Sequence, residues 1–420
     1  MQTLKKTNNF YLIVNHLFIL LPFFLITGPF LSDISVSLIA IFFIFISVKK
    51  KLYSYYNNIF FKIFIIFWLY IVFNSLINNQ NLDSLKISFF YFRLGFFSLG
   101  VWFLIEKNPD ILKKFTYSLL ICFSILILDG YLQYFTGSNI LGNSLGHGSR
   151  VSSFFGEELI LGSYLSRLFP ILFGLTILLF RNDKKKIYIV SSIFVLAEVL
   201  VFLSGERSAF FYINLSALYI ILLIKDFKKL RFITLIISIS LITLISISNP
   251  LAKNRIVDNT LDQFGVGKDT KYIFSKQHTH HYITAYKMFK DNIFFGVGVK
   301  NFRNYCSNDK YKVSHLSCST HPHNTYLQLL SEIGLLGFMF IFGFFIYICQ
   351  ISLTHFIGTF KKKLIFNDFE ICILSAFLIS LWPPTPTGNF FNNYLSIIYY
   401  LPIGMFLWSL SNKKKYENFL

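Results

Sequence analysis

The sequence predicts an all-α polytopic membrane protein with about twelve transmembrane helices and a large helical loop before the tenth span. The chain of 420 residues is 54% hydrophobic and 19% aromatic, and it contains 53 Phe. Its apolar runs repeatedly approach the ~20 residues that a spanning helix needs. Basic clusters recur in every second connection between these runs, as they do in cytoplasmic loops. Together these observations exclude a water-soluble fold.

The predicted spans follow one another closely, except before the tenth. They are centred on residues 10–27, 31–48, 59–77, 86–105, 115–135, 158–180, 187–204, 208–224, 231–248, 324–350, 369–388 and 392–410. The first apolar segment continues into the second without a small-residue cleavage site, so a cleavable signal peptide is not expected.

The net charge of +19 would suit a nucleic-acid partner, but its distribution argues against one. Basic residues gather at Lys5-Lys6, Lys49–Lys51, Lys107 with Lys113-Lys114, Arg181 with Lys184–Lys186, Lys225–Arg231, Lys361–Lys363 and Lys413–Lys415. The positive-inside rule then places both termini in the cytoplasm. The connections 136–157 and 249–323 are expected on the outer face, and no nucleic-acid partner is expected.

The segment 249–323 is too long for a simple connection and is expected to carry structure or function of its own. Its stretch His281–Asp291 has apolar residues at helical spacing, which predicts a helix along the membrane surface. A Gly-punctuated turn follows at Phe294–Val299, where close packing is favoured over phosphate binding. Cys306 and Cys318 lie in the same segment, and they form either a disulfide or two unpaired thiols.

The sequence Thr320-His321-Pro322-His323-Asn324 stands where this outer segment re-enters the membrane. Imidazole is suited to moving a proton near neutral pH, and a helix start offers free N–H groups to an anion. Thr320 or His321 is expected to cap the helix, with Pro322 and His323 in its first turn. The helix dipole would keep His323 neutral and able to accept a proton.

A polar stripe continues from this motif into the tenth span. Asn324, Gln328 and Glu332 are spaced four residues apart and should share one helix face. Gly334 and Gly337 follow, and they permit close contact between membrane helices.

Six of the nine His lie in the outer segment, at positions 278, 280, 281, 315, 321 and 323. Closely spaced His can bind zinc, which makes a metal site the main competitor of a proton-transfer site. No CxxC or HExxH spacing is present, and few carboxylates lie near the His. The prediction is therefore a site without a metal or another cofactor.

These residues resemble the signature of the O-antigen ligase and polymerase superfamily of bacterial envelope glycosyltransferases. The matching features are His323-Asn324 followed after nine residues by Gly334-x-x-Gly337, Gly205–Ser208 at a tight outer junction, and Phe295–Arg303 ahead of the motif. The resemblance implies an O-antigen ligase-like core at 158–350 that includes the loop 249–323. An N-terminal transmembrane bundle at 1–157 and C-terminal helices at 351–420 would flank this core.

The resemblance also implies an activity on the periplasmic face of the bacterial inner membrane. The donor would be a glycan on undecaprenyl pyrophosphate, surrounded by membrane lipid. The acceptor would be a sugar hydroxyl of lipid A core for a ligase, or of another glycan for a polymerase. A protein O-oligosaccharyltransferase is a further alternative. Transfer would be independent of metal and would invert the anomeric configuration. Such a reaction needs a base for the acceptor hydroxyl and cations for the leaving pyrophosphate.

Arginine is the natural cation for pyrophosphate, because its planar fork matches phosphate oxygens. Only eight of the 39 basic residues are Arg. Arg207 is the leading candidate, beside Glu206 at a short connection near the membrane surface; an ion pair with Glu206 or a membrane anchor is the alternative role. Arg150 and Arg303 are further candidates, whereas Arg255 is expected to be a solvated loop charge.

Two more Arg, Arg93 and Arg167, fall within predicted spans. An intramembrane Arg should have a partner or face a cavity, because an unpaired charge is costly there. Such residues would also suit a transporter or flippase, which is the alternative from another functional class. The one-sided cluster of His and Arg and the long outer loop favour the enzyme. His323 is the predicted catalytic base, with Asn324 orienting it or binding sugar and His321 in a supporting role.

Overall fold

The computed structural model describes every residue except 1, 79–81, 147–148, 264–273, 362 and 413–420. Over the described residues the chain is helical and contains no strand, as the sequence predicts. The helices are α1 (Gln2–Thr27), α2 (Pro29–Lys49), α3 (Ile59–Ile77), α4 (Leu82–Phe90), α5 (Phe92–Lys107), α6 (Asp110–Thr136), α7 (Leu161–Phe180), α8 (Lys184–Leu203), α9 (Arg207–Leu223), α10 (Lys228–Ser248), α11 (Pro250–Lys253), α12 (Asn259–Gln263), α13 (Lys276–Asp291), α14 (Phe302–Tyr305), α15 (Thr325–Phe360), α16 (Asp368–Ser380) and α17 (Asn393–Ser411).

Among the described residues, ten segments are long and apolar enough to cross a membrane. Helices α4 and α5 together make one of them, Leu82–Lys107. Helices α9 and α16 fall at the eighth and eleventh predicted spans, but they have 17 and 13 residues. At about 1.5 Å per residue they are shorter than a hydrocarbon layer of ~30 Å. The all-helical membrane fold is confirmed, and the count of twelve spans stays a prediction.

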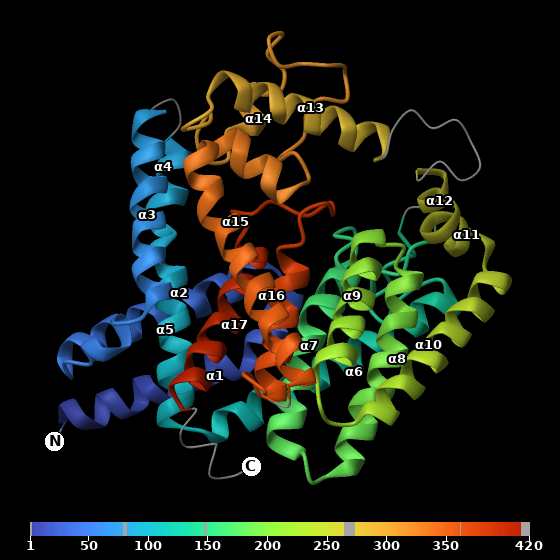
Figure 1. Cartoon of the computed structure of the whole chain (residues 1–420), viewed down its shortest axis with the longest axis horizontal. Coiled ribbons are helices and arrows are strands. Elements are labelled where there is room, and N and C mark those ends of the chain that lie inside the picture. Colours follow the sequence, from blue (N-terminus) through green and yellow to red (C-terminus); the bar gives the residue numbers. More distant parts are fainter. Residues whose placement is uncertain (1, 79–81, 147–148, 264–273, 362, 413–420) are drawn as a thin grey trace.

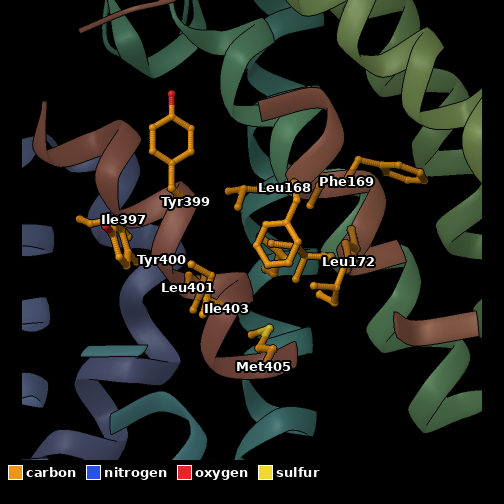
Figure 2. Packing of buried hydrophobic residues seen from close by; sticks show 14 of the residues in the cluster. Leu168, Phe169, Leu172, Ile397, Tyr399, Tyr400, Leu401, Ile403 and Met405 are labelled. Atoms are coloured by element: carbon orange, nitrogen blue, oxygen red, sulfur yellow. The ribbon is translucent and has the colours of Figure 1, made fainter. Parts of the chain in front are cut away.

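Helix α7 lies at the centre of the bundle. It packs against α6, α8, α9 and α16, and α17 packs against α5 and α16 (Figure 1). Figure 2 shows apolar side chains of α7 and α17 in this core, among them Leu168, Leu172, Leu401 and Met405. Helix α10 lies at the edge of the bundle, with few buried residues. The centre of the molecule is thus built from α7, α16 and α17.

Helices α13 and α14 lie across one end of the bundle, above the start of α15 (Figure 1); we call this the covered end. The first turns of α1 and the last turn of α17 lie at the opposite end. The predicted surface helix at 281–291 is therefore the second half of α13. A disulfide joins Cys306, directly after α14, to Cys318.

Arg93 has the partner that its place in a span requires. Its two terminal nitrogens bind both carboxylate oxygens of Asp33 on α2, at 2.8 and 2.6 Å. One nitrogen also donates to the side chain of Asn393 at the start of α17. This pairing links three helices at one point and neutralises the charge.

Helix α15 bends at Gly334, whose φ of 66° and ψ of −173° lie in a region open almost only to glycine. The bend frees the carbonyls of Ser331 and Glu332 from the helix, and they accept N–H groups of Val297 and Gly298 at 2.9 and 2.8 Å. The glycine turn at 294–299 therefore packs against the bend and ties the cover to α15. Gly334 kinks this helix, rather than sitting in a continuous one as the sequence analysis expected.

Replacing Gly334 with alanine should destabilise the protein by about 3 kcal/mol or more, because a Cβ would need a left-handed backbone and would collide with the backbone of Phe294 and Phe295. Gly343, in the same helix, is the matched control. A Cβ there meets nothing within 4 Å, so Gly343→Ala should be neutral or slightly stabilising. Thermal unfolding of the purified variants measures both effects. Equal melting temperatures for the two variants would contradict this explanation of the bend.

Candidate functional site

A cavity of about 1150 Å³ opens among the helix ends at the covered end. Four of its walls are helix N-termini. Ser163 belongs to the first turn of α7, Arg207 begins α9, His323 stands just before α15, and Tyr394 is in the first turn of α17. Each of these N-termini carries the positive end of a helix dipole. Their convergence favours a negatively charged ligand.

The side chains of the cavity add positive charge. Six cationic residues line it, namely Arg150, Arg167, Arg207, Arg255, Lys300 and Arg303, against two carboxylates, Glu158 and Glu206. Burial and the nearby Arg255 lower the pKa of Arg150 to about 10. Burial and the nearby Arg303 likewise lower the pKa of Lys300. Cations crowded in this way interact favourably with a bound anion.

Arg150 and Arg207, the predicted phosphate ligands, line the same cavity. Hydrogen bonds orient these two guanidinium groups and that of Arg255. Arg150 Nε donates to the carbonyl of Ser204 at 2.7 Å, and Arg255 Nε donates to that of Gly205 at 3.0 Å. Arg207 Nη1 donates to Gln263 Oε1 at 3.0 Å. Arg255 lies in this cavity wall, so the expectation that it is a solvated loop charge is wrong.

Glu206 holds two helices together. Its carboxylate oxygens accept the N–H groups of Gly162 and Ser163 at the start of α7, at 2.7 and 3.0 Å. Burial raises its pKa to about 7, while these N–H groups and Arg150 act in the opposite direction. Among the described residues Glu206 forms no ion pair with Arg207, which leaves the guanidinium to other ligands. Glu206 therefore positions the N-termini of α7 and α9. Its carboxylate is not a phosphate ligand.

His323 lies immediately before α15, not in its first turn as the sequence analysis expected. Its φ is 57°, a left-handed conformation that a non-glycine residue rarely adopts. Its Nε2 lies 3.0 Å from Ser319 Oγ, and its backbone carbonyl accepts the N–H of Thr387 at 3.0 Å. This unusual backbone aims the imidazole into the cavity.

The helix cap is Asn324, so the expected cap at Thr320 or His321 is wrong. Asn324 Oδ1 accepts the N–H groups of Tyr326 and Leu327, both at 3.0 Å. Its Nδ2 donates to the carbonyl of Pro383 at 2.8 Å. Both amide atoms are thus occupied in fixing the turn that carries His323.

His321 has a defined tautomer in this arrangement. Its Nε2 lies 3.2 Å from the carbonyl of Thr387, which can only accept, so Nε2 carries the proton. Its Nδ1 lies 2.9 Å from Thr320 Oγ1 and accepts from that hydroxyl. Both ring nitrogens of His321 are consequently hydrogen-bonded.

Three imidazoles pack around that of His323. Its ring centroid is 4.1 Å from that of His321, 5.2 Å from that of His278 and 5.3 Å from that of His281. Over the described residues, no three His, Cys, Asp or Glu side chains are grouped in a way that could hold a metal ion.

Burial keeps these imidazoles neutral at physiological pH. It lowers the pKa of His323 to about 4, with His281 contributing, and the pKa of His278 to about 4, with His323 contributing. Burial and His323 lower the pKa of His321 to about 3. A neutral imidazole is the form that accepts a proton.

Activity should consequently persist at mildly acidic pH. An ordinary histidine base, with a pKa of about 6.5, would lose activity below that pH. Because the pKa of His323 is lowered to about 4, kcat/KM should stay nearly constant between about pH 7 and about pH 5 and decline near pH 4. A decline centred near pH 6.5 would contradict this environment of His323.

The same shifts also affect stability, and melting temperature is the control for the pH profile. The unfolded chain binds protons below about pH 6.5, whereas these buried imidazoles bind them only near pH 3 to 4. Their contribution to stability is therefore present above pH 6.5 and is lost as the pH falls toward 4. Melting curves at each pH separate unfolding from protonation of the base.

The polar stripe of α15 forms the support beneath the cavity. Gln328 Nε2 donates to Glu332 Oε2 at 2.9 Å and to Asn389 Oδ1 at 3.0 Å. Glu332 accepts the N–H groups of Lys300 and Phe302 at 3.0 and 3.3 Å. The predicted shared face of Asn324, Gln328 and Glu332 therefore anchors the segment that presents Lys300 and Arg303.

Sequence reasoning missed the connection between α16 and α17. Its residues 382, 384–389 and 392 line the cavity, and Thr387 binds both His321 and His323. The signal was present as Pro383-Pro384, Pro386 and Gly388, which interrupt two apolar runs. His278 was noted only as a possible metal ligand, and Arg167 was given no role.

Comparison with protein families identifies part of the chain. Residues 191–342 match a family model described as O-antigen ligase. The matched segment extends from α8 into α15 and includes Arg207, Arg303, His321 and His323, whereas Arg150 and the 382–392 connection lie outside it. None of the curated proteins compared with the chain matches it.

Proposed function

We propose that the chain is a multi-pass membrane glycosyltransferase of the O-antigen ligase superfamily, from the family match over residues 191–342 and its segments of span length, and we propose a specific reaction for it. The protein moves a glycan from undecaprenyl pyrophosphate to a sugar hydroxyl of lipid A core, on the periplasmic face of the inner membrane. The reaction uses no metal and inverts the anomeric carbon.

The observation that carries this proposal is the set of residues that line the cavity. One space at one end of the bundle joins a neutral imidazole, His323, to the N-termini of four helices and to the guanidinium groups of Arg150, Arg207 and Arg303. A transfer from pyrophosphate needs these two elements, a base for the acceptor and positive charge for the leaving group.

The chemical step follows from this pairing. The acceptor hydroxyl gives its proton to His323 while its oxygen attacks the anomeric carbon of the donor glycan. The bond between that carbon and the phosphate oxygen breaks, and its electron pair stays on the departing polyprenyl pyrophosphate. Arg207 and Arg150, with Arg303, stabilise the developing negative charge. A single displacement on the face opposite the leaving group inverts the configuration.

The remaining predicted site residues position these groups. Asn324 caps α15 and holds the turn of His323, and Glu206 joins the N-termini of α7 and α9. His321, with Nε2 held by the carbonyl of Thr387, packs against His323 and excludes water from one of its faces. None of these three residues needs to exchange a proton with substrate.

The disulfide Cys306–Cys318 supports a periplasmic site, because disulfides persist in oxidising compartments. The position of the polar cavity residues at one end of the bundle supports an enzyme over a transporter or flippase. Transport sites typically lie near the midplane between repeated halves. The cavity here lies among helix starts at a single end.

Deletion of the gene, read on a lipopolysaccharide gel, tests the proposal in cells. A ligase predicts loss of all glycan-capped lipid A and accumulation of lipid-linked polymer. A single repeat left on the core would identify a polymerase instead. Complementation with the wild-type gene is the control, and an unchanged glycan pattern in the deletion strain would overturn the proposal.

A further inference from the structure

Arg167 is a buried cation that the proposed reaction does not yet use. It lies on α7, six residues after the helix start, or about 9 Å along the axis into the bundle. Its side chain lines the cavity, and the residue is only 2% exposed. Its Nε and Nη1 have no hydrogen-bond partner among the described residues, and no carboxylate there forms an ion pair with it.

The other arginines in the bundle differ from Arg167 in this respect. Arg93 is paired with Asp33, and Arg231 donates to the carbonyls of Ile220 and Ile224. Arg167 has instead the ring of Tyr212, with its guanidinium carbon 4.6 Å from the ring centroid. A cation–π contact offsets only part of the cost of burying a charge. A ligand with negative charge would supply the missing partner.

The groups around Arg167 are also donors. The hydroxyls of Tyr212, Tyr394 and Tyr399 are buried and form no hydrogen bond of good geometry in the described part of the chain, although the side chains of Thr385, Ser163 and Thr325, respectively, lie near them. Tyr394 and Tyr399 lie close enough to interact electrostatically with Arg167. Figure 2 shows Tyr399 pointing away from the apolar side chains, toward the N-terminal end of α17. The carboxylate of Glu206, which interacts electrostatically with Tyr394, is already held by the start of α7.

This donor group adjoins the reaction centre. Tyr212 and Tyr394 line the same cavity as His323. Thr387, which accepts from His321, also lines it and binds Thr325 Oγ1 at the start of α15 at 2.8 Å. The donors and the histidines thus share one cavity.

We propose that Arg167, Tyr212 and Tyr394, which line the cavity, form an inner anion subsite that binds a phosphate group of the lipid-linked pyrophosphate. This inference rests on the proposed function and deepens it. The pyrophosphate then binds to the outer cations Arg150 and Arg207 on one side and to the inner subsite on the other. The planar fork of Arg167 offers its free Nε and Nη1 to phosphate oxygens, and the tyrosine hydroxyls donate to the remaining ones.

The test compares Arg167→Met and Arg167→Lys with the wild-type protein, using undecaprenyl pyrophosphate as probe and undecaprenol as neutral control. Loss of a charged hydrogen bond predicts binding about ten- to a hundredfold weaker for Arg167→Met. Arg167→Lys should recover part of the affinity. Because Met removes an unpaired buried charge, the melting temperature without ligand should be unchanged or higher.

A purely structural role for Arg167 predicts the opposite pattern. In that case the melting temperature of Arg167→Met falls without ligand, while affinity for the pyrophosphate is retained, and the inference is overturned. If the wild-type protein binds undecaprenyl pyrophosphate no better than undecaprenol, the proposed donor itself is wrong. Normal binding by wild type and by Arg167→Met alike removes the inner subsite and leaves the proposed function standing.

A second pair of variants tests the hydroxyl groups. Tyr212→Phe keeps the ring beneath Arg167 and removes one donor, so binding of the probe should weaken severalfold. The matched control is Tyr219→Phe on the same helix, whose hydroxyl binds Ser352 outside the cavity. That variant should bind as wild type does. If acidic groups of a glycan were the true ligand, Arg167→Met would weaken binding only to donors with acidic sugars, which would also overturn the phosphate assignment.

Discussion

Replacing His323 with asparagine should lower the rate of glycan transfer by roughly 100- to 10,000-fold, the usual contribution of a general base. Asparagine is the preferred substitution because it tolerates the left-handed backbone that His323 adopts, with φ of 57°. The variant should therefore fold and still bind the lipid-linked donor. Initial transfer rates and donor affinity of purified protein measure the two properties separately.

His315→Asn is the control for this experiment. His315 lies in the same outer segment, is exposed, and does not line the cavity. Its substitution should leave transfer unchanged. If His323→Asn transferred glycan at the wild-type rate, His323 would not be the base, and the buried histidine cluster would need another explanation.

Arg207→Gln should lower kcat by about 100-fold or more, as removal of a donor to a developing oxyanion does in other enzymes. Arg207 stands at the N-terminus of α9, and within the residues that the structure describes its guanidinium is bound through Nη1 alone, to Gln263. Arg207→Lys keeps the charge without the planar fork, so it should recover only part of the rate. Steady-state kinetics with the polyprenyl-linked donor measure both variants.

Arg181→Gln provides the matched control. Arg181 follows the last turn of α7 and pairs with Asp226 at 2.7 Å, away from the cavity. Its loss should have little effect on kcat. Equal rates for Arg207→Gln and Arg181→Gln would exclude Arg207 from the leaving-group site.

Much of the fold follows from composition, because a membrane imposes simple rules on a chain. Apolar runs of span length must be helical when no water satisfies their backbone groups. Each predicted span accordingly overlaps a helix, although α16 ends at Ser380, before the end of the eleventh predicted span at residue 388. The division at residues 157/158 and 350/351 stays a prediction.

The candidate site was predictable where residue type and chain position were sufficient. His323 and Arg207 combine chemistry suited to the reaction with a place at the start of a span. The exact helix start was not predictable, because Thr320, His321 and Asn324 can each cap a helix. The choice of Asn324 depends on contacts with Pro383 and Thr387, some sixty residues away in sequence.

Other features of the site depend on packing alone. Arg255 becomes part of the cavity wall because Gly205 lets its side chain reach the backbone of the α8–α9 turn. Arg93 and Arg167 look alike in the sequence, since each lies inside an apolar run. Only the three-dimensional arrangement distinguishes the arginine paired with Asp33 from the one that lines a cavity without an acidic partner.

The central claim is glycan transfer from a lipid-linked pyrophosphate, and reconstitution of the purified protein tests it most directly. The reaction would contain an undecaprenyl-pyrophosphate-linked glycan and lipid A core, with a metal chelator present. We predict that one undecaprenyl pyrophosphate is released for each glycan transferred, with inverted configuration in the product and no effect of the chelator. Absence of transfer by a folded protein that binds both substrates, or transfer with retained configuration, would contradict the account.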